Sequence, residues 1–451
     1  MANKKEKTDF FIIFKEAAIT AVITAAICCL LLFATGLIPQ SAIKESCIKS
    51  AEYFKDKELF DDIMPNRLNT RRDNYGDILL LNTMYHISGQ NPVRSLIQSF
   101  YYNPENESVN ISFYDSVMED KEPNVNWSRY WQGATVLVRP LFVWVGIEQA
   151  RLIIGWMVLA LMISCVALLW RLGSKSAAVS YLLGNGIVQV WMCLFCIEYA
   201  MTFLVANVIL LAVLCLFLKK ESEDRIRKRS LLLMAVSGVV TCFVDLLTTE
   251  TLTVTIPLLF LMILLYEQGK LRGIKEEIRY LTGCGISWCL SYVGMFLFKW
   301  LLAAMVLGTD AFTTALGAAG KRLGGAVITG YAGADEAVNF GERVIGILYR
   351  NQGSLFPFKE KMTMGASLWL FFGVCFLCFA IVYLFRPKNL PFNIIVTCLL
   401  LGAVPYVRYL VLQNHAYIHY FFTYRAQMVT VVAILYCTWQ FGLKGIIIRK
   451  K

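Results

Sequence analysis

The sequence predicts an all-α polytopic membrane protein with about ten transmembrane helices. Of its 451 residues, 57% are hydrophobic and only 17% are charged, and the mean hydropathy is +0.57. Soluble domains carry about 25% charged residues. Apolar stretches of about 20 residues, the length that a helix needs to cross a bilayer, recur along the whole chain. No segment has the composition of a separate soluble domain of ordinary size.

Hydropathy also gives approximate boundaries for these helices. The predicted spans are 15–38, 150–170, 176–194, 199–218, 231–247, 251–267, 281–306, 366–385, 391–411 and 425–443. The first span follows the basic segment MANKKEK and could be mistaken for a signal peptide. Its apolar stretch is longer than the core of such a peptide, so we expect an uncleaved anchor.

Basic residues alternate between successive connections and thereby predict the orientation. Lys and Arg residues before span one and after spans two, four, six, eight and ten all fall on one side, whereas the short connections 195–198, 248–250 and 412–424 contain none. The positive-inside rule places both termini in the cytoplasm, in what we expect to be a bacterial plasma membrane. The net charge of +11 therefore reports topology and does not indicate a nucleic-acid surface.

This orientation divides the chain into five segments. They are an N-terminal anchor (1–38), a first outer loop (39–149), a transmembrane bundle (150–306), a second outer loop (307–365), and C-terminal helices with a basic tail (366–451). In the first loop, SRYWQGATVLVRPLFVWVG predicts an interfacial helix along the outer leaflet. The Gly-rich second loop is typical of a mobile segment that orders on a ligand.

The cysteine pattern argues against a disulfide framework or a metal site. Thirteen of the 14 cysteines fall inside apolar stretches, and Cys47 is the single one expected to be exposed. Cys193/Cys196 and Cys375/Cys378 have CxxC spacing, but no His or carboxylate cluster completes a site, so packing explains them best. We expect no metal and no bound cofactor. Nucleotide-binding motifs are also missing from the sequence.

Unusual polar residues gather on the predicted outer face. A charge inside a bilayer is costly, so such residues mark either function or specific pairing. Most of them lie in the outer loops or at the outer ends of spans: Asp73, Asp77, Arg139, Glu198, Asp245, Glu250, Arg408, His415, His419 and Arg425. Lys299 lies deeper, in span seven.

Each of the carboxylates also has a structural interpretation. Asp73 fits the N-cap of a helix, and Asp77 would then lie in its first turn, where the helix dipole favours a negative charge. Asp245 could cap a helix end or form an ion pair. On a helix, Asp73 and Asp77 would share one face, so one could act as a base while the other orients it.

The cationic candidates have structural alternatives too. His415 and His419 fit an interfacial aromatic belt; their spacing also suits zinc, but no third ligand is evident. Arg139 and Arg408 could extend to lipid headgroups. Lys299 is expected to pair with a carboxylate inside the bundle.

Such a set of residues suits sugar transfer from a lipid-linked phosphate. A phosphate leaving group is already a weak base and needs cations to stabilise its charge rather than a general acid. The acceptor hydroxyl needs a base, and a positioned carboxylate can serve. The mechanism requires neither a metal nor a nucleotide-binding fold.

The topology and four short stretches resemble the GT-C class of integral-membrane glycosyltransferases. RRDNYGDILLLN (71–82) resembles the acidic stretch of the first outer loop in that class. RYWQGATVLVRPL (129–141), FVDLLTTETLTVTIPL (243–258) and NHAYIHYFFTYR (414–425) look like stretches of bacterial membrane proteins of this type, including glucosyltransferases of the GtrII kind. Many GT-C enzymes have adjacent acidic residues, whereas Asp73 and Asp77 are four apart.

The resemblance implies a donor, an acceptor and roles for individual residues. The donor would be a polyprenyl-phosphate sugar and the acceptor an envelope or cell-surface glycan or a lipid-linked molecule, with Asp73 or Asp77 as the base. The residues implied for the lipid phosphate are Arg139, Lys299, Arg408, His415, His419 and Arg425. Trp127, Tyr130 and Trp131 could stack on sugar rings or anchor the loop at the interface.

Two other functions fit the same sequence. A transporter or flippase of a lipid-linked or small polar substrate would also have about ten spans with buried charges. Transporters often show internal repeats and sites near the membrane midplane, and here only Lys299 lies deep. A non-enzymatic scaffold for envelope assembly would tolerate amide replacement of the outer carboxylates. The sequence leaves the oligomeric state open.

Overall fold

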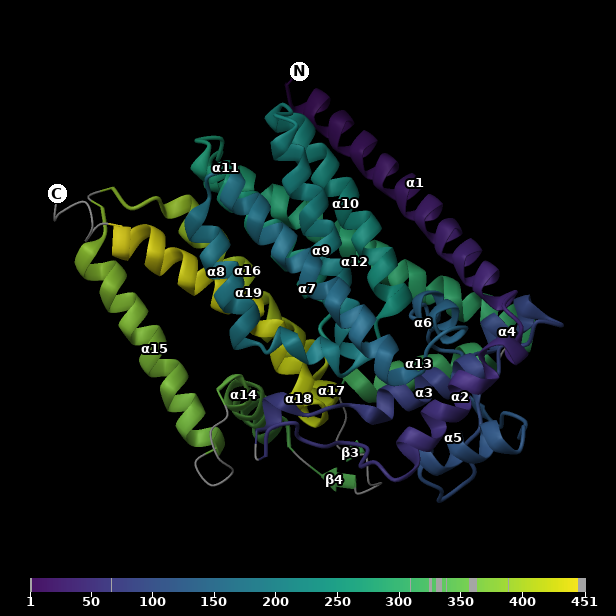
Figure 1. Ribbon diagram of the computed structural model, residues 1–451. Helices are drawn as coiled ribbons and strands as arrows, with labels where there is room; N and C mark the ends of the chain where they lie inside the picture. The colour runs from purple at the N-terminus through teal and green to yellow at the C-terminus, as the bar shows by residue number, and fades with distance from the viewer. Residues whose placement is uncertain are drawn as a thin grey trace.

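The computed structural model describes residues 2–65, 67–308, 310–323, 327–329, 335–337, 339–356, 363–387 and 389–444. Most of these residues are helical, and long helices run side by side through the molecule (Figure 1). Two short antiparallel strand pairs complete the regular structure of the described residues: β1 (Phe100–Tyr101) with β2 (Val125–Asn126), and β3 (Val327–Thr329) with β4 (Asp335–Ala337). The prediction of an all-α membrane protein is confirmed.

Within the described residues, seven helical segments are long and apolar enough to cross a membrane. They are Ile12–Gly36 in α1 (Ala2–Gly36), α7 (Ile147–Arg171), α9 (Ile197–Leu218), α12 (Ile274–Leu307), Gly365–Phe385 in α15 (Thr363–Phe385), α16 (Phe392–Val411) and Tyr420–Leu443. The last comprises α18 (Tyr420–Thr423), η4 (Tyr424–Gln427), α19 (Met428–Cys437) and η5 (Thr438–Leu443). Each overlaps a predicted span.

The other three predicted spans fall on helices that are shorter or more polar. The stretch 176–194 is divided between α8 (Lys175–Ile187) and η2 (Val190–Leu194), and 231–247 lies in α10 (Glu223–Val244), which begins with charged residues. α11 (Leu252–Glu267) has only 16 residues, and every residue from Leu252 to Leu265 is buried. A helix that is apolar on all sides lies in the core of a protein. Because other helices surround α11, it can be shorter than a helix that faces lipid. The count of ten spans stays a prediction.

Ion pairs and hydrogen bonds gather the basic connections at one end of the bundle. Lys228 at the start of α10 pairs with Glu16 of α1 at 2.8 Å. Arg272, before α12, pairs with Glu223 at 2.7 Å, and its carbonyl accepts a hydrogen bond from Asn393 at the start of α16. We call this the basic end. The predicted basic tail lies outside the described residues from position 445 onward.

The first outer loop forms an ordered cap at the opposite end of the bundle (Figure 1). Its helices are α2 (Gln40–Lys55), η1 (Leu68–Thr70), α3 (Asn74–Tyr85), α4 (Pro92–Gln98), α5 (Val109–Met118) and α6 (Thr135–Phe142). The predicted interfacial helix is reduced to the eight residues of α6, which packs against α1, α2, α3 and α7. The stretch therefore contains a helix as predicted, and its place along the outer leaflet stays a prediction.

The second outer loop also contains regular structure. Its described part forms α13 (Asp310–Leu323), the β3–β4 pair and α14 (Phe340–Leu355), where a mobile Gly-rich loop had been predicted. Asn351 of α14 donates to the carbonyl of Ala416 at 2.9 Å and accepts from the Thr423 hydroxyl at 2.6 Å. These bonds join α14 to α17 (Gln413–Ile418) and α18, so the segment that holds both predicted histidines is packed against the second loop.

All 14 cysteines are free thiols. Cys47 has no exposed surface, because it lies on the buried face of α2, and the prediction that it is exposed is therefore wrong.

Candidate functional site

The Asp77 carboxylate joins three segments of the chain at the cap end. It lies in the first turn of α3, forms an ion pair with Arg151 of α7 at 2.7 Å, and accepts hydrogen bonds from the backbone N–H groups of Ile197 (3.1 Å) and Glu198 (3.3 Å). Arg151 also donates to the Asn74 side chain at 2.9 Å. Because the first N–H groups of a helix have no partner within it, Asp77 satisfies the N-terminus of α9. Its geometry is that of a structural anchor.

Asp73 lies at the N-cap of α3, as the sequence predicts. Its Oδ1 accepts a hydrogen bond from the backbone N–H of Gly76 at 2.8 Å, and the residue is only 2% exposed. The Asp73 carboxyl is also in hydrogen-bonding contact with the carboxyl of Glu198 in the first turn of α9. Two carboxyl groups this close oppose each other's ionisation, which favours a proton on one of them. Glu198 is the more accessible member.

The surroundings keep the Asp73 carboxyl easy to protonate. Burial raises the pKa of Asp73 to about 7, and the nearby charge of Asp77 adds to the rise. The Gly76 N–H, the charge of Arg151 and the hydrogen bond with Glu198 oppose it. A carboxyl with a pKa near neutrality exchanges its proton at working pH, which is what a general base must do.

Gly76 leaves room for the Glu198 carboxylate. A Cβ atom at position 76 would lie 1.9 Å from Oε2 of Glu198 and 3.5 Å from Oδ1 of Asp73. The first distance is far shorter than any non-bonded contact, so a side chain here would displace the carboxylate. The absence of a side chain at this position is therefore part of the site.

Two arginines flank Tyr130, and the charge of one of them, Arg129, reaches Tyr75. Burial raises the pKa of the Tyr75 phenol to about 12; the charges of Asp73 and Glu198 add to this rise, and that of Arg129 opposes it. The guanidinium carbon of Arg129 lies 5.3 Å from the centre of the Tyr130 ring, and that of Arg322 lies 5.7 Å from the same centre. Tyr130 is thus flanked by two cations close to the acidic pair.

Neither arginine has a carboxylate partner among the described residues. The Nε atoms of both Arg129 and Arg322 are buried and make no hydrogen bond. A half-buried guanidinium without an anion is unusual, because its donors lose water and gain nothing in return. An incoming phosphate would supply the missing acceptors.

Both arginines were missed in the sequence analysis. Arg129 stands in RYWQG and Arg322 in KRLGG, both in the long outer loops. The positive-inside rule applies to short loops, and the first outer loop holds many other basic residues, such as Arg71 and Arg72, so the sequence carries no signal that sets these two apart.

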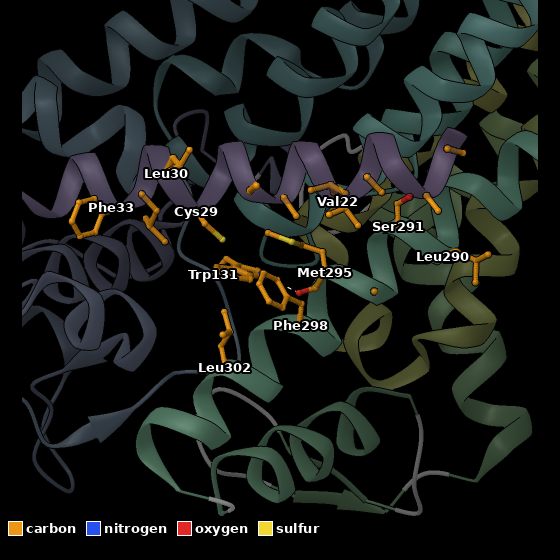
Figure 2. A pocket seen from close by; sticks show the side chains of 18 of the residues that line it. Val22, Cys29, Leu30, Phe33, Trp131, Leu290, Ser291, Met295, Phe298 and Leu302 are labelled. Atoms are coloured by element: carbon orange, nitrogen blue, oxygen red, sulfur yellow. Dashed lines mark hydrogen bonds between the residues drawn. The ribbon is translucent and has the colours of Figure 1, made fainter. Parts of the chain in front are cut away.

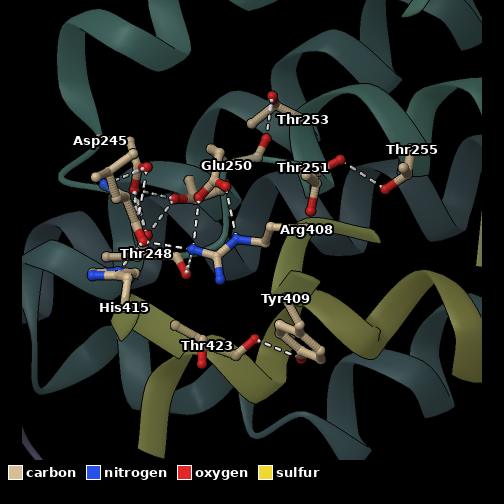
Figure 3. A network of polar contacts seen from close by, with 12 residues as sticks. Asp245, Thr248, Glu250, Thr251, Thr253, Thr255, Arg408, Tyr409, His415 and Thr423 are labelled. Carbon is tan, nitrogen blue, oxygen red and sulfur yellow. Dashed lines mark hydrogen bonds and ion pairs between the residues drawn. The ribbon is translucent and has the colours of Figure 1, made fainter. Parts of the chain in front are cut away.

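A second polar network surrounds Arg408 (Figure 3). Arg408 forms an ion pair with Glu250 at 2.7 Å and donates to the carbonyl of Leu247 at 2.7 Å. The Asp245 carboxylate accepts hydrogen bonds from the Thr202 hydroxyl and from the backbone and hydroxyl of Thr248. The structure therefore brings Asp245, Glu250 and Arg408 together, and their polar groups largely satisfy one another. This arrangement fixes the turn between α10 and α11.

The two predicted histidines lie beside this network with their rings 4.3 Å apart. Nε2 of His415 donates to the carbonyl of Leu247 at 2.7 Å, since a carbonyl can only accept. Burial lowers the pKa of His415 well below its ordinary value, and the charges of His419 and Arg408 add to the fall. Burial also lowers the pKa of His419 to about 3, with Arg322 contributing. Both rings are neutral at neutral pH and bring no charge to an anion.

The three remaining predicted cations bind backbone carbonyls. Arg139, fully buried, donates to the carbonyls of Met84, Ile38 and Ile87 and so fastens α6 to α1 and α3. Lys299 donates to the carbonyl of Ile97 at 2.8 Å.

Arg425 donates to the carbonyls of Asn69 and Phe421 and lies 4.3 Å from the centre of the Tyr199 ring. Among the described residues, neither Arg425 nor Lys299 contacts a carboxylate, and the prediction that Lys299 pairs with one is wrong. The carbonyls at the end of α4 take that role, because the C-terminus of a helix is negative.

The predicted aromatic residues are buried rather than open to solvent. Trp127, Tyr130 and Trp131 are 7%, 4% and 3% exposed. Trp131 donates from Nε1 to the carbonyl of Met295 at 2.9 Å and packs against Phe243. Of these three residues, Tyr130 is the one that lies between the two arginines.

No family model matches the chain, and no curated protein and no solved structure was found to be similar to it. In the described part of the chain, no group of three or more His, Cys, Asp and Glu side chains is placed to hold a metal ion. The candidate site therefore consists of the Asp73–Glu198 carboxyl pair, Tyr75, and Arg129 and Arg322 around Tyr130.

The two aspartates of α3 are expected to respond differently to amide substitution. Asp77→Asn leaves Arg151 buried without its charge partner, and removing one member of a buried ion pair costs about 3–5 kcal/mol. Asp73→Asn keeps an N-cap of equal quality, so its free energy of unfolding should change by less than about 1 kcal/mol. Chemical unfolding of the two purified variants in detergent measures both. Equal destabilisation would contradict the assignment of Asp77 as the anchor.

Proposed function

We propose that the protein is a membrane glycosyltransferase that moves a sugar from a polyprenyl-phosphate donor to a hydroxyl acceptor at the cap end of the bundle. The observation that carries the proposal is one carboxyl pair, Asp73 and Glu198, close to two arginines that lack an anionic partner among the described residues. The charges of Asp73, Glu198 and Arg129 all reach Tyr75, so acid and cation lie close together, and no ion pair joins them among the described residues. Transfer of a group from a phosphate to a hydroxyl needs both.

The reaction breaks the bond between the anomeric carbon and the phosphate oxygen and forms a bond from that carbon to the acceptor oxygen. The acceptor proton passes to the Asp73–Glu198 pair, with Glu198 as the accessible member and Asp73 behind it. The phosphate leaves with the bonding electrons. Its growing negative charge is stabilised by Arg129 and Arg322, whose planar guanidinium groups match phosphate oxygens in geometry.

The predicted residues fall into a catalytic group and a structural group. Asp73 acts with Glu198 as the base, whereas Asp77 holds α9 and α3 in place through Arg151. The Arg408–Glu250 network and the neutral histidines form the wall beside Arg322. The acceptor would be a glycan or a lipid-linked molecule of the cell envelope.

The membrane architecture supports the proposed donor and the proposed face of the membrane. Seven apolar helices support a location in the bilayer, where a polyprenyl chain resides. If the basic end faces the cytoplasm, as the positive-inside rule requires, the site opens to the outer face. A transporter is the alternative, but the one deep cation that suggested it, Lys299, is bound to the carbonyls of α4.

Removing either carboxylate of the pair should abolish transfer. Loss of a general base lowers the rate by about 10²- to 10⁴-fold, so Asp73→Asn and Glu198→Gln should lose kcat while the protein stays folded. The measurement is transfer of radiolabelled sugar from a polyprenyl-phosphate donor in vesicles. Glu148→Gln, an amide change in the first turn of α7 away from the pair, is the control. Wild-type rates in both pair variants would refute the proposed base.

The rate should rise with pH through neutrality. Only the deprotonated pair accepts a proton, and the pKa of Asp73 is raised to about 7, so activity is full above about pH 8 and falls about tenfold per unit below about pH 6. Initial rates of kcat/KM between pH 5 and 9 give the profile. A flat profile across this range would show that the buried pair is not the titrating base.

Replacing either of the two arginines should lower the catalytic efficiency with the phosphate donor. A charge-assisted hydrogen bond is worth about 1.5–3 kcal/mol, so Arg129→Gln or Arg322→Gln should lower kcat/KM by about 10- to 100-fold. Lys321→Gln is the matched control, since Lys321 is exposed on the same helix one residue away. A similar loss in Lys321→Gln would show that only the general positive charge of the surface matters.

A further inference from the structure

An apolar groove runs between α1 and α12 on the flank of the bundle (Figure 2). Its volume is about 910 Å³, within the range of about 300–1,000 Å³ that is usual for ligand pockets. Small residues on both helices create it, among them Ala21 and Ala25 of α1 and Ser291 and Gly294 of α12. A Cβ atom at Gly294 would meet nothing within 4 Å. The two helices face each other here without interlocking.

α1 is nevertheless fixed at both ends of the groove. At the basic end Glu16 pairs with Lys228 of α10, and beyond the far end of α1 the carbonyl of Ile38 accepts a hydrogen bond from Arg139. The groove is therefore a built space between anchored helices and not the result of a loosely placed helix.

A second cavity, of about 1130 Å³, continues the groove at the basic end. It lies between the same helices α1, α10 and α12. Along α12 its lining residues Arg279 and Gly283 continue, at intervals of three or four residues, into Ser287, Leu290 and Gly294 of the groove. Residues at this spacing share one helix face, so the two cavities form a single cleft with a polar end and an apolar length.

The polar end is predominantly basic. Five cationic side chains line it against two acidic ones: Arg227, Lys228, Arg272, Lys275 and Arg279, with Asp224 and Glu276. Arg227 is held by the buried carboxylate of Glu277 at 2.7 Å. The other four cations are exposed. Lys228 pairs with Glu16 and Arg272 with Glu223 and Asp224, so these two offer an anion only the donors that their ion pairs leave over.

The shape and charge of the cleft identify its occupant. Basic pockets between transmembrane helices on the cytoplasmic side bind the headgroups of anionic lipids. A further transmembrane helix is about 10 Å wide and 30 Å long, which requires more volume than the two cavities together provide. A hydrocarbon chain is narrow enough to lie between Ala21 and Gly294.

We propose that this cleft is a binding site for an anionic phospholipid of the leaflet at the basic end. The lipid phosphate lies among Lys228, Lys275 and Arg279, and an acyl chain fills the apolar groove between α1 and α12. The lipid completes the packing of α1 against the bundle. The headgroup end of this site lies at the opposite end of the bundle from the carboxyl pair, whereas the apolar groove extends to Leu96 and Trp131 of the cap. The inference does not rest on the proposed transferase activity.

Native mass spectrometry of the purified protein, exchanged into equal amounts of dioleoylphosphatidylglycerol and dioleoylphosphatidylcholine, tests the proposal. The wild-type protein should retain phosphatidylglycerol preferentially. Lys275→Gln with Arg279→Gln should reduce its retention by about fivefold for each charge removed, and Gly294→Leu should reduce it by filling the groove. The matched controls are Lys219→Gln with Lys220→Gln, at the same end outside the cleft, and Gly285→Leu, also in open space on α12.

Several results would overturn the proposal. If the wild-type protein retains both phospholipids equally, the cleft does not select an anionic headgroup. This result is obtained without any variant. Losses in the control variants as large as those in the cleft variants would show a general surface effect. A retained isoprenoid chain that Gly294→Leu displaces, with phosphatidylglycerol unaffected, would give the groove to a different occupant.

Discussion

The contact between Asp77, Arg151 and the first N–H groups of α9 is the interaction on which the cap end of the molecule depends. A buried guanidinium is costly without a carboxylate, and the start of a helix is costly without an acceptor, so α3, α7 and α9 require one another. The positions of the site residues follow from this mutual dependence of the three helices. Glu198 meets Asp73 because the residue before it is held by Asp77.

The sequence alone predicted the helical membrane architecture and the gathering of polar residues at one end. It also placed Asp73 at a helix N-cap, because that position is decided by local backbone chemistry. It could not separate the roles of Asp73 and Asp77, since the partners that do so come from distant segments; Ile197, for example, is 120 residues from Asp77. The same limit applies to α11, whose short length becomes intelligible only when its neighbours surround it.

Burial sorts the charged groups at the cap end into three kinds. Asp77, Glu250 and Arg408 lie in ion pairs, which give rigidity. His415 and His419 lose their charge because burial and neighbouring cations both oppose protonation. The carboxyl pair and the arginines around Tyr130 keep an unmet electrostatic need in the described part of the chain. An anionic substrate and its hydroxyl acceptor would satisfy both the arginines and the carboxyl pair. Without them, each of these groups destabilises the fold locally.

Gly76 has a consequence for how this protein can change during evolution. Any side chain at position 76 would occupy the space of the Glu198 carboxylate, although the two positions lie in helices far apart in the sequence. A mutation that adds a methyl group at 76 pushes the Glu198 carboxylate aside unless residue 198 has already become smaller. Residue 198 can shorten first without a clash, whereas a side chain gained first at 76 displaces the acid, so the acid at 198 depends on the glycine that makes room for it.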